Sequence, residues 1–201
     1  MRDVGMRPIE EIRFLGGHVA LDFVNTAEGR GEPDSGDALQ QPEHLRTWGQ
    51  RQGILSAAST LRGGADGQEL RRALEAREVL YRVFSAQAQG QPPPPADLRE
   101  LAALTAAAHR AGKLVSAASG QIEWRWSPDE LSSVRHVAAH TATELLSQLP
   151  PGRLKQCPGE RCGWLFLDAT KRGNRRWCSM DECGQEAKVA RRRQRQATGY
   201  L

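Results

Sequence analysis

Hydrophobic residues recur every three or four positions in three long stretches of the chain. This period is that of a helix with one buried face. Each stretch opens on a pattern typical of a helix start, in which a small polar residue or proline precedes a glutamate. The sequence therefore predicts three amphipathic helices, at residues 66–88, 97–112 and 127–149.

Other segments have a different period. Val19, Leu21 and Phe23 alternate with other residues, which predicts a strand that leads into a polar loop over residues 27–41. Residues 113–118 and 121–126 predict a β-hairpin, and 42–52 a short helix with Leu45 and Trp48 facing inward. The fold class expected for residues 10–150 is thus α+β, mostly helical with a small β-hairpin component.

The chain changes character after Pro150-Pro151-Gly152, which predicts the end of a helix and the start of a new unit. All four cysteines follow, as Cys157-x4-Cys162 and Cys178-x4-Cys183, with fifteen residues between the pairs. Two pairs of thiols at this spacing supply the tetrahedral ligand set of one structural Zn²⁺, with no coordination position left open for catalysis.

Two disulfides or redox-sensing thiols are the alternatives to zinc. The N-terminus has neither the apolar region nor the small-residue cleavage site of a secretory signal, so we expect a cytoplasmic protein. Thiols in the cytoplasm are kept reduced, which favours the metal. No apolar run has the length of a membrane span.

The cysteine-containing segment predicts a treble-clef-like zinc finger. Residues 163–168 predict a strand, 169–174 a turn, and 175–178 a return strand. Ser179-x-x-Glu182 predicts a helix that begins at about Met180 and places Cys183 in its first turn. A unit near 50 residues buries little core, so we expect it to depend on its metal.

Positive charge is concentrated in this segment. From Arg153 onward there are 12 Lys/Arg and 5 Asp/Glu, a formal charge of +7, whereas residues 1–152 carry −3. Basic residues on a zinc-held frame are typical of a surface that binds nucleic acid, although they can also be a solvated face or contact acidic proteins. The candidate residues are Lys171, Arg172, Arg175, Arg176, Lys188, Arg191, Arg192, Arg193 and Arg195.

Polar residues near the first predicted strand are candidates for binding a small ligand: His18, Asp22, Asn25 and Thr26. Their ordinary structural role, in which they bind loop and helix-end amides, is favoured by the residue types alone. His136, His140 and Glu144 share one helix face, but the pattern lacks the glutamate of a zinc-protease helix. We find no phosphate-binding loop or nucleophile elbow, and we do not expect an enzyme.

The residues around the cysteines, Trp164-Leu-Phe-x-Asp168 and Arg175-Arg-Trp-Cys-Ser-Met180, resemble the CGNR zinc finger of bacteria. Gly17-His-x-Ala-Leu-Asp22-Phe-x-Asn25-Thr26 resembles the start of the ABATE domain, which precedes that finger in the same family. The resemblance implies a stress-induced transcription regulator, with an ABATE-like ligand-sensing domain at 10–150 and a CGNR-like finger with a basic helix at 153–197. It also gives more weight to a ligand site near Asp22 and Asn25.

The chain departs from the family pattern after Cys183-Gly184, where Gln185-Glu186 replaces the Asn-Arg that gives the finger its name. If that arginine contacts phosphate in relatives, this chain should bind more weakly or elsewhere. We predict a transcription regulator that binds nucleic acid, DNA in preference to RNA, and that senses a small-molecule effector or partner. A protein-interaction module with a purely structural finger is the alternative, and an enzyme is less favoured. Reading a palindrome would need a homodimer, and no sustained heptad supplies one.

Overall fold

A computed structural model describes residues 7–30 and 35–197 of the 201-residue chain. The first six residues, on which the expected absence of a secretory signal partly rests, lie outside these ranges, as does part of the loop at 27–41. Among the described residues, no helix has both the length and the apolar character needed to cross a bilayer.

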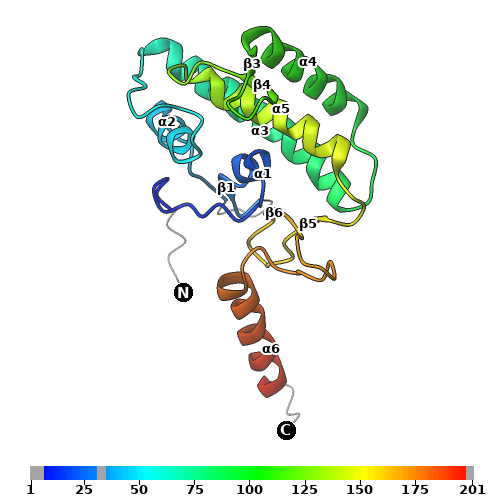
Figure 1. Ribbon diagram of the computed structural model, residues 1–201. Coiled ribbons are helices and arrows are strands. Elements are labelled where there is room, and N and C mark those ends of the chain that lie inside the picture. The colour runs from blue at the N-terminus through cyan, green and yellow to red at the C-terminus, as the bar shows by residue number, and fades with distance from the viewer. Residues whose placement is uncertain (1–6, 31–34, 198–201) are drawn as a thin grey trace.

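Three long helices form the body of the protein (Figure 1). They are α3 (Gly64–Ala88), α4 (Pro95–Ala111) and α5 (Ser132–Gln148), which pack against one another. The short helices α1 (Val19–Val24) and α2 (Pro42–Arg51) cover the other side of α3 and α5. The α+β fold class is confirmed, since the only strands in the described ranges form three two-stranded antiparallel sheets.

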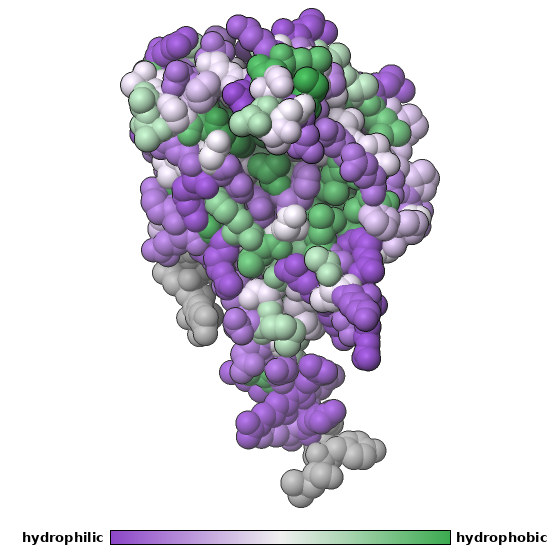
Figure 2. Space-filling view, viewed as in Figure 1, coloured by the Kyte–Doolittle hydropathy of each residue, from purple (hydrophilic) through white to green (hydrophobic). Residues whose placement is uncertain are grey.

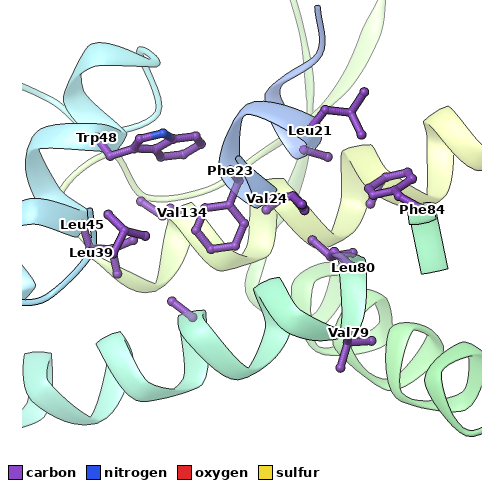
Figure 3. Close-up of a cluster of buried hydrophobic side chains, with 14 of the residues drawn as sticks. Leu21, Phe23, Val24, Leu39, Leu45, Trp48, Val79, Leu80, Phe84 and Val134 are labelled. Carbon is purple, nitrogen blue, oxygen red and sulfur yellow. The ribbon is translucent and has the colours of Figure 1, made fainter. Parts of the chain in front are cut away.

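The core lies between these helices and is filled by large apolar side chains (Figure 3). Phe23 and Trp48 are fully buried with their ring centroids 5.3 Å apart. Leu80 and Phe84 of α3 are also fully buried, because the three- and four-residue spacing places them on one face. The predicted inward positions of Leu45 and Trp48 on α2 are therefore confirmed.

The strand predicted around Val19, Leu21 and Phe23 is wrong, because this segment is helix α1. His18 caps the helix, with its Nδ1 accepting a hydrogen bond from the Ala20 amide at 3.3 Å. Alternation misleads here because the intervening residues are also buried, so the segment has no solvent-facing side. A short segment buried all round gives the same pattern as a helix or as a strand.

Three helix starts also differ from the prediction, and one of them is α4, which begins at Pro95 instead of at Asp97. Helix α5 begins at Ser132 instead of near Pro128, and the Ser127 carbonyl accepts a hydrogen bond from the Ser133 hydroxyl at 2.6 Å. Asp66 does not precede α3 but lies inside its first turn, where its carboxylate accepts from the Arg62 amide. The predicted hairpin is present as β3 (Lys113–Ser116) paired with β4 (Ile122–Arg125).

The predicted pairing within the finger is wrong. Strand β6 (Leu165–Leu167) pairs with β5 (Leu154–Gln156), which precedes the first cysteine, and residues 175–178 form no strand. The return segment is held instead by side chains, since the Asp168 carboxylate accepts from the Arg175 amide at 2.7 Å. The remaining strands, β1 (Ala27–Glu28) and β2 (Gly36–Asp37), pair across the polar loop.

The finger is joined to the helical body by a pair of hydrogen bonds from one side chain. The Asn25 amide donates through Nδ2 to the Leu165 carbonyl at 2.8 Å and accepts through Oδ1 from the Leu165 amide at 2.9 Å. Leu154 and Leu165 belong to the same apolar core as the helices. The division of the chain into domains at 10–150 and 153–197 stays a prediction, and the two parts share this core.

We expect Asn25→Ala to lower the free energy of unfolding by about 2–4 kcal/mol, because it leaves the buried amide and carbonyl of Leu165 without partners. Chemical denaturation followed by tryptophan fluorescence measures this change. The matched control is Gln87→Ala on the exposed face of α3, which should change stability by less than about 0.5 kcal/mol. Equal stability of the two variants would contradict the role given to Asn25.

Candidate metal centre and nucleic-acid interface

Four sulfur atoms meet at one point of the finger. The ligand atoms of Cys157, Cys162, Cys178 and Cys183 all lie within 4.8 Å of one another. Sγ of Cys178 is 3.5 Å from Sγ of Cys162 and 3.6 Å from Sγ of Cys183, and all four cysteines are free. In the ranges that the structure describes, no other cluster of three or more potential metal ligands was found.

The turn that carries the first two cysteines is the connection between β5 and β6. Hydrogen bonds within the turn hold its shape. The Cys157 amide donates to the Trp164 carbonyl at 2.7 Å, and the Cys162 amide donates to the Gly159 carbonyl at 3.1 Å. A Cβ atom at Gly159 would lie 3.0 Å from Sγ of Cys183. Glycine at this position therefore lets the turn approach the sulfur of the other pair.

The second pair lies at the start of the C-terminal helix. Residues Met180–Gly184 form one turn of π-helix, which continues as α6 (Gln185–Ala197). Cys183 is in this first turn, as predicted, and the Cys178 amide donates to Sγ of Cys157 at 3.5 Å. The metal centre thus fixes the point from which α6 departs.

The arrangement fits one structural Zn²⁺. A tetrahedral ion with Zn–S bonds of about 2.3 Å requires sulfur atoms about 3.8 Å apart, close to the observed separations. Four thiolates leave no position for water, so the ion would hold the fold and would not carry out chemistry. Trp164 and Phe166 are buried beside Cys157 and Cys178, and they keep solvent from that side of the cluster.

Arg175, one of the candidate nucleic-acid ligands, is part of the framework of the finger. Its guanidinium lies 4.3 Å above the Phe166 ring. Four of its five N–H groups donate to main-chain carbonyls, those of Leu15, Leu167, Trp177 and Cys178, at 2.7–3.1 Å. These bonds leave Arg175 little capacity to bind phosphate.

The loop after β6 is stabilised by residues that the sequence did not single out. The buried Asp168 carboxylate accepts from Lys155 Nζ at 2.7 Å and from the Thr170 amide at 2.9 Å. Lys155 also donates to the Gly173 and Arg175 carbonyls at 2.6 and 3.0 Å. The sequence signals were the place of Asp168 in the finger motif and the threonine two residues after it, a spacing typical of a side chain that caps a loop amide.

The remaining basic residues are exposed. Arg176 lies with its guanidinium carbon 5.0 Å from the Trp177 ring centroid, and Lys171 and Arg172 are on the loop after β6. On α6 every side chain from position 188 to 196 is exposed. Figure 1 shows α6 projecting away from the helical body, and Figure 2 shows its surface as almost entirely hydrophilic. Five basic residues lie on this helix: Lys188, Arg191, Arg192, Arg193 and Arg195.

The four candidate ligand-binding residues near α1 have partners within the protein. Gly16 donates its amide to Asp22 Oδ1 at 2.8 Å, and burial raises the pKa of Asp22 to about 6. Thr26 donates to the Phe23 carbonyl at 2.7 Å, and Asn25 is bound to Leu165 as described above. Burial lowers the pKa of His18, the helix cap, against the opposite effect of Glu144. These contacts favour the ordinary structural role, and a ligand site here stays an untested prediction.

Zinc removal should unfold the finger selectively, since metal binding contributes on the order of 10 kcal/mol to such small units. The full-length protein should contain one Zn²⁺ per chain by elemental analysis. After chelation, hydrogen exchange should accelerate at the amides of Cys178 and Gly184 but not in the middle of α4. Cys162→Ser should reproduce this pattern without chelator. Unchanged exchange after complete removal of zinc would refute the structural role of the metal.

Arg175→Lys should lower the free energy of unfolding by about 2–3 kcal/mol, because a single ammonium group cannot replace the four bonds of the guanidinium fork. The neighbouring Arg176→Lys is the matched control, since Arg176 is exposed and should tolerate the change within about 0.5 kcal/mol. Thermal and chemical denaturation of the zinc-loaded variants measure both values. A larger loss in Arg176→Lys would contradict the assignment.

Comparison with known families agrees with this geometry. The model of the CGNR zinc finger matches residues 153–196, which contain all four cysteines and α6. The model of the ABATE family, described as a putative stress-induced transcription regulator, matches residues 17–148. A search of curated proteins found no match. The two matches together span most of the chain, which therefore belongs to the ABATE family and carries a CGNR zinc finger with four cysteines that fit one structural Zn²⁺.

Proposed function

We propose that this protein regulates transcription by binding duplex DNA through the loop after β6 and helix α6. The observation that carries this proposal is the exposure of every side chain from position 188 to 196, on a helix that holds five basic residues. The helix has a single large apolar side chain, the exposed Val189, so it gains little from packing against its own protein. A phosphate backbone supplies the complementary charge, and each contact releases counterions.

The dimensions of α6 favour DNA over RNA. Thirteen residues give a helix about 20 Å long and about 10 Å wide, which the major groove of B-form DNA can accommodate. The major groove of an RNA duplex is too narrow and deep for such a helix. The loop after β6, which carries Lys171 and Arg172, is at the same end of the molecule as α6 (Figure 1), so we place its contacts on the backbone beside the groove.

The substitution in the family motif fits this orientation. Gln185 and Glu186 follow the π-helical turn Met180–Gly184 in one continuous helical segment. Phosphate would be repelled at Glu186, so we place the contacts at the more distal Lys188, Arg191, Arg192, Arg193 and Arg195. Arg175 is excluded from the interface because its donors are bound within the finger.

The alternative is a protein-interaction module, in which α6 contacts an acidic partner and the finger is only a scaffold. Both functions use the same positive charges, but binding to a duplex releases condensed counterions, so log K should fall with log salt by about 0.9 for each phosphate contact. The matched families are not classes of enzyme, which supports regulation over catalysis. We assign the control of binding to the helical body, through an effector or a partner.

The test replaces Arg191, Arg192, Arg193 and Arg195 by alanine in the full-length, zinc-loaded protein. Fluorescence anisotropy with a 30-base-pair duplex should show at least a roughly tenfold weaker affinity at 100 mM salt, and the slope of log K against log salt should fall by about 3. The same series with single-stranded RNA measures the preference for DNA.

The matched control removes the same charge from exposed positions on the helical body, as Arg71, Arg72, Arg99 and Arg110 to alanine. This control should bind almost as the native protein does. Equal losses in both quadruple variants would show that only net charge matters. Absence of binding by the native protein at 50 mM salt would reject the proposal and favour the protein-interaction module.

A further inference from the structure

A cavity of about 450 Å³ that is widely open to solvent lies between strand β4 and helix α5, away from the zinc finger. Its volume is within the range of small-molecule sites. The wall on the hairpin side includes Trp124 and Trp126, and the wall on the helix side includes Val137, His140 and Glu144. In the view of Figure 2, hydrophobic side chains gather at the surface near this hairpin.

The two tryptophans form a rigid aromatic wall. Trp124 lies in β4 and Trp126 follows the end of that strand, and their ring planes are 25° apart with centroids separated by 6.3 Å. Trp126 Nε1 donates to the Ala108 carbonyl at 2.8 Å, which fixes that ring against α4. A Cβ atom at Gly112 would lie 2.9–3.0 Å from both indoles, so glycine at this position allows their close approach.

A chain of polar groups holds a carboxylate at the opposite wall. His109 Nε2 is 3.1 Å from His140 Nδ1, and His140 Nε2 is 3.3 Å from a carboxylate oxygen of Glu144. His109 also stacks on Trp124, with ring centroids 4.5 Å apart. With both histidines protonated on Nε2, each N–H in the chain has an acceptor. This arrangement orients the Glu144 side chain, although 55% of its surface is exposed.

The charges around the cavity are unequal. Burial lowers the pKa of His140, assisted by His109 and opposed by Glu144, so this imidazole is neutral near pH 7. The lining residue Glu123 is paired with Arg125 at 2.6 Å. Glu144 therefore contributes the negative charge that remains in a lining that also includes the two indoles.

We propose that this cavity is a binding site for a small organic cation with a flat aromatic ring. Indole faces attract cations through the ring quadrupole, and they also stack on aromatic rings. Glu144 supplies the counter-charge, and its contact with His140 holds the carboxylate in place. The site is separate from the finger, so its test does not depend on the function proposed for α6.

The experiment compares phenyltrimethylammonium with its neutral isostere, tert-butylbenzene, by calorimetry and tryptophan quenching on the full-length, zinc-loaded protein. The two probes have the same shape and differ in one charge. We expect the cation to bind saturably and at least about tenfold more tightly than the neutral probe. Glu144→Gln should weaken the cation about fivefold and leave the neutral probe unchanged. Trp124→Phe should weaken it about threefold, because indole is the stronger cation acceptor.

Glu43→Gln, which changes an exposed carboxylate on α2, is the control for net charge and should bind the cation as the native protein does. Circular dichroism confirms that each variant is folded. Equal affinity for the two probes would mean an apolar cavity without cation recognition. An unchanged affinity of the Glu144→Gln variant for the cation would mean that the cation binds elsewhere. Either result, or the absence of saturable binding, would overturn the proposal.

Discussion

The convergence of four thiols is the interaction on which the C-terminal quarter of this protein depends. The finger has few apolar side chains of its own. The second apolar cluster of the protein lies in the finger and is built around Cys157 and Cys178. Sulfur atoms 3.5–3.6 Å apart are held at the separation that a tetrahedral ion imposes. Because Cys183 lies in the turn from which α6 departs, the ion also determines the direction of the basic helix.

The finger nevertheless packs against the helical body. Leu154 and Leu165 pack in the same core as the long helices, and Asn25 binds both polar groups of the Leu165 backbone. On the opposite edge, Gln156 donates to the Tyr81 hydroxyl at 2.8 Å, and Arg175 reaches the Leu15 carbonyl. A change in the packing of α1 or α3 would therefore act directly on β5 and β6, the strands on either side of the first cysteine pair.

Local sequence was sufficient for the features that local chemistry determines. The cysteine spacing gave the metal centre, and hydrophobic spacing gave the three long helices to within a few residues. The roles of Asn25 and Arg175 could not be assigned from sequence, because their partners are main-chain groups, 140 residues away for Asn25 and up to 160 residues away for Arg175. Any segment could supply such carbonyls, so no residue pattern marks them. The error at α1 has a different cause. A segment that is buried on all sides lacks the regular alternation of apolar and polar positions that distinguishes a helix from a strand.

The position of α5 gives a physical condition for communication between the helical body and the finger. This helix carries His140 and Glu144 at the cavity and ends at Gln148, six residues before β5 begins. A ligand can shift an equilibrium only by the difference in its affinity for the two states. If α5 is held in one arrangement, a bound cation adds stability without altering α6. Regulation therefore requires a second arrangement of α5 relative to the finger, in which the cavity has a different affinity for the ligand and the contacts of Leu154 or Leu165 differ.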